Sequence, residues 1–466
     1  MDSKKSPTIF LNEVSHEQIE LSSLETQRRQ QDTQSNASIT TEPSPSVNIQ
    51  ELPPVDKGWQ AWSFCFAGVV LEALVWGFSF SYGIFQAYYT SHPPFDKASR
   101  IAVASVGPIA LAIEYGEGFL LSFFYTRYPD WIKTSMWLGL LLSVLCLALS
   151  SFVNQVWLLI LLQGVGLGVA GAVLYWPVVL YVSEWFVEHR GLAGGVIFAG
   201  GGLGGFFFPF IVNSLLDHVG HRWTLRALAL LQGVLGGIAL LGIRPRIPPP
   251  KYRPGQRRPS LMPRRLQFFK RKVFWTYSAA HFLQAMSYFP VSLYIAVFTE
   301  SISSPLSATI VLSLFNSAGV VGQVLLGYLT DRFPYPWIMF ASTLGTALSA
   351  FLLWGFADTL ARVFAFAIIF GGLGGGFASI AFAAATDSAN PNTEQAPIAL
   401  TAFSVGKGIA AVVGPVLSGL LLEAGKSVSY GPYGKFGFGP VEIFVGSCAL
   451  VCSFCSVGVA MSRPRV

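Results

Sequence analysis

Twelve long apolar runs constrain the fold of this chain more than any other feature. They span residues 60–86, 101–124, 135–152, 156–181, 192–211, 224–243, 274–298, 307–328, 336–356, 361–384, 399–421 and 442–461. Each is about as long as the ~20 residues with which a helix crosses a bilayer, and only a helix satisfies its own backbone hydrogen bonds in hydrocarbon. Only 12% of the 466 residues are charged, against about 25% in soluble domains. The sequence therefore predicts an all-α polytopic membrane protein with twelve transmembrane helices.

The polar segments between these runs divide the chain into five parts. Residues 1–56 hold nine acidic and four basic residues and are rich in Ser, Thr, Gln and Pro, so we expect a disordered cytoplasmic tail. Residues 57–243 and 273–461 each contain six runs and are predicted to form an N-terminal and a C-terminal half. A basic cytoplasmic linker, 244–272, joins the halves, and a short cytoplasmic tail, 462–466, ends the chain.

The distribution of lysine and arginine predicts the orientation in the membrane. With the N-terminus inside, the inner loops and the C-terminal tail hold seventeen basic residues, and the outer loops hold seven. The positive-inside rule therefore places both termini in the cytoplasm. The plasma membrane is the expected location. Because the basic residues lie between apolar runs, we expect them to face the lipid bilayer surface and not nucleic acid.

The two halves contain similar segments at equivalent places. The segment LLSFFYTRYP, at 120–129, aligns with LLGYLTDRFP, at 325–334, and shares its paired leucines, its arginine and its final proline. Both segments follow the second run of their half. Two parallel six-helix repeats around a central site are typical of one class of secondary transporter.

The segment GYLTDRF, which begins at Gly327, resembles the GxLxDR signature of the major facilitator superfamily. The resemblance implies a gate at the cytoplasmic side, in which Gly327 allows close helix approach and Asp331 and Arg332 form a charge lock. The segment RGLAGG, which begins at Arg190, is similar to the basic start of the fifth helix in the same superfamily, and Arg190 is expected to belong to the same cytoplasmic gate. The first-half copy of the signature has Ser122 for the glycine and no aspartate, so we do not expect a symmetric lock.

Two further segments resemble the monocarboxylate-porter family, especially its fungal members. They are DKGWQAW at 56–62 and GPVLSG at 414–419. Members of that family that carry small anions tend to have a lysine in the first helix and an aspartate and an arginine in the eighth. Here the first run has no cation, and the eighth run has Gln323 at the arginine position, with Asn316 as its other polar candidate. The sequence therefore does not support lactate-like symport through the familiar residues.

Four ionisable residues inside the runs are candidates for substrate binding or coupling. They are Glu72 in the first run, Glu114 and Glu117 in the second and Lys407 in the eleventh. Each costs about 2.5–3.5 kcal/mol if unpaired at the bilayer centre. The resemblance implies that the second and eleventh helices pack across the halves, so a pair between Lys407 and Glu114 or Glu117 is expected. Lys407 then either binds an anionic or polar substrate group or switches with these carboxylates, or it forms a permanent ion pair that holds the halves together.

Glu72 lies about midway along the first run, where a carboxyl group in a low-dielectric environment can take up a proton from solution. Two interpretations remain open: Glu72 couples transport to protons, or it is a neutral side chain bonded to a neighbouring helix. The resemblance also implies that the first, fourth, seventh and tenth helices face the cavity. Tyr82, Tyr175, Trp176 and Tyr288 are therefore candidates to contact an apolar or aromatic solute, against the alternative that they face lipid or other helices.

The sequence contains no pattern that predicts an enzyme. The six histidines form no cluster with metal-ligand spacing, and no nucleophile or ATP-binding motif is present, so we expect no metal and no cofactor. The predicted function is secondary active transport of a small organic solute, a carboxylate or a related metabolite, by alternating access with protons as the coupling ion. The alternatives are an efflux pump for a secondary metabolite and a nutrient sensor built on a transporter fold.

Overall fold

The computed structural model describes residues 52–250, 252, 256–261, 266–426 and 431–463. The predicted N-terminal tail lies outside the described residues up to position 51, as do parts of the predicted linker and most of the predicted C-terminal tail. Residues from Pro53 onward form one compact unit, and the description below concerns this unit.

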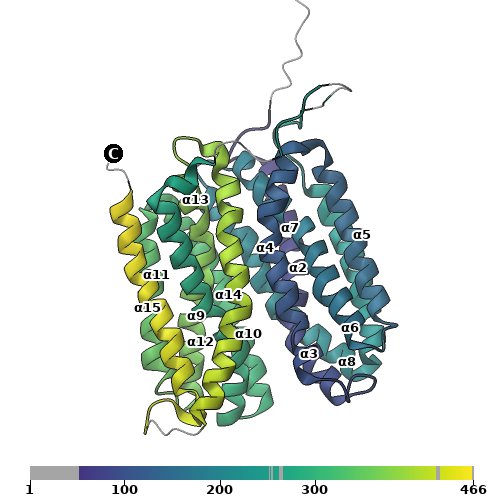
Figure 1. Cartoon of the computed structure of the whole chain (residues 1–466), viewed down its shortest axis with the longest axis vertical. Helices are drawn as coiled ribbons and strands as arrows, with labels where there is room; N and C mark the ends of the chain where they lie inside the picture. The colour runs from purple at the N-terminus through teal and green to yellow at the C-terminus, as the bar shows by residue number, and fades with distance from the viewer. Residues whose placement is uncertain (1–51, 251, 253–255, 262–265, 427–430, 464–466) are drawn as a thin grey trace, which may run out of the picture. The chain divides into compact units, whose positions relative to one another are not determined.

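The helices form two bundles, the first purple to teal and the second green to yellow in Figure 1. The first bundle contains α2 (Trp59–Ser91), α3 (Arg100–Ala104), α4 (Val106–Arg127), α5 (Ile132–Ser150), α6 (Val156–Leu159), α7 (Leu167–Trp185) and α8 (Arg190–Gly242). The second contains α9 (Lys272–Ile302), α10 (Pro305–Arg332), α11 (Tyr335–Leu348), α12 (Leu360–Gly376), α13 (Ala381–Ala389), α14 (Ala396–Gly425) and α15 (Gly439–Ser462). A π-helical turn joins α6 to α7, and a 3-10 turn, Phe377–Ile380, joins α12 to α13.

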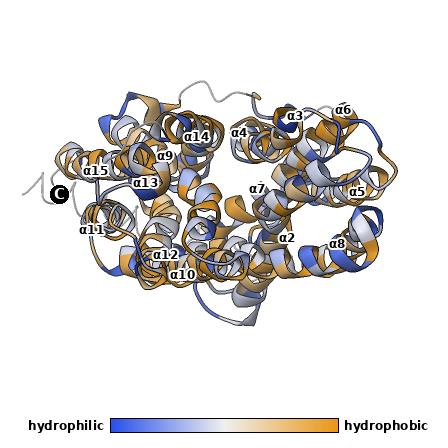
Figure 2. Cartoon of the chain, turned by 90° about the horizontal axis from the view of Figure 1, so that it is seen from below, coloured by the Kyte–Doolittle hydropathy of each residue, from blue (hydrophilic) through white to orange (hydrophobic). Residues whose placement is uncertain are grey.

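Among the described residues, 11 helical segments are long and apolar enough to cross a membrane. One of them, α8, contains Gly220 with φ 72° and ψ 170°, a backbone conformation that favours glycine. This kink divides α8 into two arms, 190–219 and 221–242, so the described chain has twelve membrane crossings. The predicted twelve-helix fold is confirmed. Large apolar side chains are exposed on both bundles, such as Leu141 on α5 and Phe454 on α15, as lipid contact requires. Hydrophobic residues, in orange, recur along the helices of both bundles (Figure 2).

Glycines allow the helices to approach closely at several crossings. In the first bundle, Gly200 of α8 lies against the carbonyl of Val69 on α2. In the second, Gly322 of α10 lies against the carbonyl of Gly372 on α12. Without a strong hydrophobic force between helices in lipid, such close packing is a main source of helix association.

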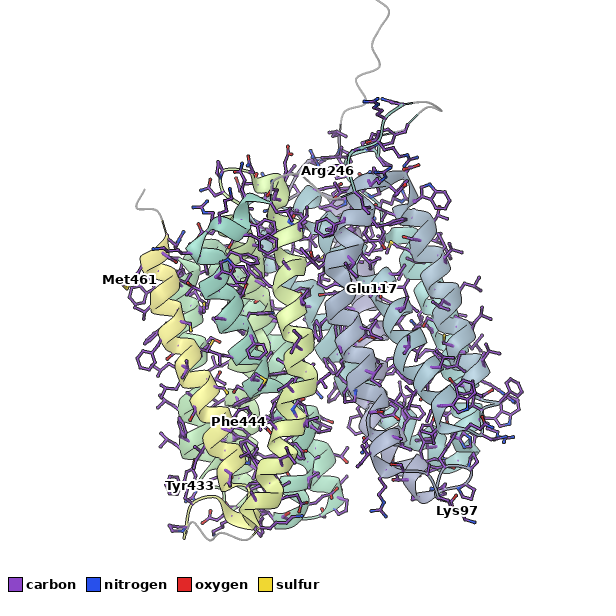
Figure 3. All side chains as sticks on the ribbon, viewed as in Figure 1. Lys97, Glu117, Arg246, Tyr433, Phe444 and Met461 are labelled. Atoms are coloured by element: carbon purple, nitrogen blue, oxygen red, sulfur yellow. The ribbon has the colours of Figure 1, made fainter. Side chains whose placement is uncertain are left out.

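The two bundles meet along two helix pairs, α8 with α10 and α14 with α4. Arg246 and Met461 lie at one end of the bundles, here named the linker end, and Lys97 and Tyr433 lie at the opposite end (Figure 3). Midway between the ends, the side-chain amide of Asn316 on α10 donates a hydrogen bond to the carbonyl of Gly205 on α8, at 3.1 Å.

Two described parts of the linker, 244–250 and 256–261, contact the first bundle. The Glu184 carboxylate on α7 accepts the backbone N–H groups of Arg246 and Ile247 at 3.0 and 3.1 Å. Further along, Arg258 forms a two-pronged ion pair with Asp130, at 2.7 and 3.0 Å. The last described part, 266–272, contacts the second bundle, where Arg271 donates to the carbonyl of Asn390.

Candidate functional site

A cavity lies between the two bundles, and both of them contribute to its wall. The lining residues are Glu72, Trp76, Phe80, Tyr115, Tyr175, Trp176, Phe198, Gly201, Gly202, His281, Tyr288, Asn316, Gly319, Gln323, Ala378, Ala381, Leu400, Ser404 and Lys407. They come from α2, α4, α7 and α8 of the first bundle and from α9, α10, α13, α14 and the 3-10 turn before α13 of the second. Seven of the ten residues proposed from the sequence for substrate binding or coupling are among them.

The other three predicted residues, Tyr82, Glu114 and Glu117, do not line this cavity. The Tyr82 hydroxyl donates to the carbonyl of Val103 at 2.7 Å, so its ring packs inside the first bundle. Both carboxylate oxygens of Glu114 lie 3.1 Å from the Ser79 hydroxyl on α2. Glu117, labelled in Figure 3, lies about one turn nearer the linker end than Glu114 on α4.

The ion pair expected between Lys407 and Glu114 or Glu117 does not form among the described residues. The Lys407 ammonium instead lies over the ring of Tyr115, with its Nζ 4.6 Å from the ring centroid. The reason is the helical rotation of about 100° per residue. On α4, Tyr115 faces α14, whereas the preceding residue, Glu114, faces the interior of the first bundle.

Glu72 is the carboxyl group that shares the cavity with Lys407. Its residue is 6% exposed, and its charge interacts with that of Lys407. Because Glu72 lies on α2 and Lys407 on α14, this interaction connects the two bundles across the cavity. A change in the charge of either group therefore changes the attraction between the bundles.

Trp76 is at the centre of an aromatic wall on the first-bundle side. Its ring centroid lies 4.4 Å from that of Tyr115, 5.4 Å from that of Tyr175 and 5.9 Å from that of Phe80. The neighbouring indole of Trp176 donates to the carbonyl of Glu114 at 2.9 Å, which fixes its orientation. The cavity thus combines a broad aromatic surface with few charged groups, as in many small-molecule sites.

Sequence reasoning missed His281, a cavity residue on α9 that is 3% exposed. Its ring stacks with those of Tyr277 and Phe377, with centroids 5.7 and 5.9 Å away. His281 is a single histidine within an apolar run, so it belongs to no cluster with metal-ligand spacing. The signal that could have identified His281 is its position inside the seventh apolar run.

A contact between the bundles at the linker end involves the predicted gate residues. The Asp331 carboxylate on α10 accepts the backbone N–H groups of Gly191 and Leu192 on α8, each at 2.8 Å. These N–H groups have no partner within their own helix, and the start of a helix favours negative charge. Gly327 lies against the carbonyl of Gly191 and permits this approach. We name the Asp331 contact with α8 the latch.

The two arginines of the predicted gate do not pair with Asp331. Arg332 turns away and lies over the ring of Tyr328, 5.0 Å from its centroid. Arg190 donates to the Thr386 hydroxyl on α13 at 3.0 Å, a second contact between the bundles. The expected lock between Asp331 and Arg332 is therefore replaced by a bond from Asp331 to the backbone of α8.

A second carboxylate caps the segment just before α8. Asp56, which precedes α2, accepts the backbone N–H groups of Val187, Glu188 and His189 at 3.0–3.1 Å. Burial alone would raise the pKa of the Asp56 carboxyl, but these hydrogen bonds hold its net pKa below the usual value. Asp56 and α8 belong to the same bundle, so this cap lies within one bundle, whereas the latch joins the two bundles.

The chain is similar over most of its length to known transporters. It is 26% identical over 434 residues to an MFS-type transporter of Gibberella zeae, which covers 91% of this chain and 92% of the relative. It is 28% identical over 364 residues to the fujikurins efflux protein of Gibberella fujikuroi, covering 77% and 76% of the two chains.

A solved structure shares the fold. The crystal structure of a bacterial homologue of the human lysosomal transporter Spinster, inward-facing and unoccupied, matches with a TM-score of 0.56 and 13% identity. The match covers 87% of this chain and 98% of that chain. The sequence profile of the Major Facilitator Superfamily matches residues 109–333 and 280–455, most of the membrane-spanning region. The chain therefore belongs to the Major Facilitator Superfamily of membrane transporters.

Proposed function

We propose that this transporter exports an organic metabolite by alternating access and that protons drive the export. The observation that carries the proposal is the shared cavity, with Glu72 on the first bundle and Lys407 on the second. In transporters built from two repeats, a site between them faces one side of the membrane and then the other as the halves rock.

The direction of transport is inferred from a relative and from the cavity. A protein that matches 77% of this chain is named an efflux protein for fujikurins. The aromatic wall around Trp76 suits a metabolite larger and less polar than lactate. The resemblance to monocarboxylate porters rests on two short motifs, and Gln323 replaces the expected cation. Import of a carboxylate is the second candidate, because Lys407 provides a cation in the cavity.

Three residues receive roles in this proposal. Lys407 binds the anionic group of the substrate, Glu72 carries the coupling proton, and Asp331 closes the linker end when the cavity faces the other side. The seventeen-to-seven distribution of basic residues supports a cytoplasmic position for the linker end. The plasma membrane is the proposed location, because export from the cell requires it.

A comparative metabolite profile tests the proposal. Metabolites are measured inside cells and in the medium for a deletion strain, a strain with the full chain restored, and strains carrying Lys407→Ala or the matched control Lys97→Ala. Export predicts a compound that accumulates inside the deletion and Lys407→Ala strains, is depleted in their medium, and is normal in the Lys97→Ala strain. A compound left unused in the medium would establish import instead. Unchanged levels in both compartments would overturn transport at the plasma membrane.

A further inference from the structure

Lys407 forms no close ion pair in the cavity, although the Glu72 carboxyl group lies near enough for the two charges to interact. None of the ion pairs among the described residues includes Lys407, and its Nζ faces the ring of Tyr115 at 4.6 Å. A cation over a ring face is stabilised by the ring quadrupole, but all three N–H donors of an ammonium group still favour oxygen acceptors. A bound anion would therefore supply the oxygen acceptors that the Lys407 ammonium group lacks.

One more nitrogen atom of the cavity wall lacks a hydrogen-bond partner among the described residues. It is Nδ1 of His281, a residue that is 3% exposed. The indole of Trp76 interacts instead with the Glu72 carboxyl group on the same helix. A buried polar atom without a partner destabilises a protein, so the His281 nitrogen indicates a polar group on a bound molecule. The unpaired Oε1 of Gln323 is the complementary acceptor for a donor on that molecule.

The remaining wall is aromatic and favours a flat molecule. Trp76 and Tyr115 lie with centroids 4.4 Å apart, and Tyr175 meets Trp76 edge-on at 5.4 Å. Flat conjugated rings gain from contact with such faces and edges, whereas a saturated ring gains only by burial.

We infer that the cavity takes a planar, conjugated organic anion that carries a hydroxyl group. Its charged group lies against Lys407, an acceptor oxygen receives a hydrogen bond from His281, and its hydroxyl donates to Gln323. The inference rests on the proposed function, since it names the class of substrate that the same cavity moves.

Three small probes separate the contributions of charge and conjugation on the unaltered protein. The full chain is purified into lipid nanodiscs, and binding is measured by calorimetry with 6-hydroxy-2-naphthoate, the neutral 6-hydroxy-2-naphthamide and the saturated trans-4-hydroxycyclohexanecarboxylate. We expect the naphthoate to bind about tenfold more tightly than either of the others. Equal affinities for the three probes, or no binding of the naphthoate, would overturn the inference without any variant.

Variants assign the preference to the named side chains. Lys407→Gln should remove the preference for naphthoate over naphthamide. His281→Phe should weaken naphthoate binding about three- to tenfold. The matched controls Lys97→Gln and His218→Phe change exposed residues away from the cavity and should bind like the unaltered protein. A Lys407→Gln protein that keeps the full preference would contradict the assignment.

The binding assay tests the inferred substrate class, and the metabolite profile tests the proposed export, so each proposal can be overturned without the other. Export without naphthoate binding would overturn the inferred substrate class and leave the proposed function standing. Lys407-dependent naphthoate binding with an unchanged metabolite profile would overturn export and leave the chemistry of the cavity standing.

Discussion

At the scale of single residues, the sequence identified the ionisable side chains within the membrane spans but not the groups that they contact. An ionisable side chain inside an apolar run is conspicuous because its burial costs free energy, and this reasoning found both Glu72 and Lys407 of the cavity. The expected partner of Lys407 was wrong because neighbouring residues on a helix point in different directions. Glu114 faces Ser79, and Tyr115 faces Lys407.

Glu72→Gln tests proton coupling directly. Glutamine keeps the size of the side chain and cannot exchange a proton, so we expect export driven by a pH gradient to fall to the level of cells without the transporter. Surface expression should be unchanged. The measurement is the rate of export of the metabolite found by profiling, with and without a pH gradient. Glu423→Gln, at an exposed position, is the control. Normal pH dependence in Glu72→Gln would rule out this role for Glu72.

Asp56→Ala tests the cap in front of α8 and its pH dependence. Loss of a capping carboxylate should lower the free energy of unfolding by about 1 kcal/mol near pH 7. Because the folded protein lowers the pKa of Asp56, the charged carboxylate stabilises the fold above the unfolded pKa of about 3.9. This stabilisation is lost as the pH falls through the lower pKa of the folded state.

Thermal unfolding of the unaltered protein and Asp56→Ala should therefore differ near pH 7 and converge as the pH falls below about 4. Asp96→Ala, at an exposed position, controls for the general loss of an acidic residue. A difference that is independent of pH would show that the carboxylate charge does not stabilise the cap.

At the scale of elements, apolar runs located the helices but not their internal breaks. The run predicted over 361–384 is interrupted by the 3-10 turn Phe377–Ile380 between α12 and α13. Just before this turn, side chains from neighbouring helices bond to successive carbonyls: Ser342 to that of Leu373 and Gln284 to that of Gly374, at 2.8 and 2.7 Å. Hydropathy contains no information on such contacts, because they depend on which helices pack together.

Gly322→Ala tests the close crossing of α10 and α12. An added Cβ would meet the backbone carbonyl of Gly372, which cannot rotate away as a side chain can. We expect a loss of stability of about 1–3 kcal/mol, seen as a lower thermal midpoint in nanodiscs. Gly116→Ala on α4 is the matched control, because no atom lies within 4 Å of its added Cβ. Equal midpoints for the two variants would contradict the packing account.

At the scale of the whole molecule, the repeated six-helix pattern was enough to predict the fold. Twelve apolar runs, two similar segments and the GYLTDRF motif led to the architecture that the structure and the superfamily match confirm. The mechanism of closure was not predictable. The sequence suggested a lock between Asp331 and Arg332, whereas Asp331 bonds to backbone N–H groups of α8, which carry no sequence signal of their own.

The central claim is that the bundles rock around the cavity and that the latch holds the linker end closed. Spin labels at exposed positions on the two bundles can follow both ends of the molecule. Val187 and Glu394 suit the linker end, and Val219 and Leu306 suit the opposite end. The labels are introduced into a chain without its five native cysteines.

Pulsed electron paramagnetic resonance then measures the distances between the labels. It compares the protein with an unaltered latch with Asp331→Asn, and Asp217→Asn is the control. Asparagine keeps the shape of the aspartate and removes its charge, so the latch weakens. We predict that in Asp331→Asn the 187–394 distance lengthens while the 219–306 distance shortens. Unchanged distances, or changes of the same sign at both ends, would contradict alternating access governed by this latch.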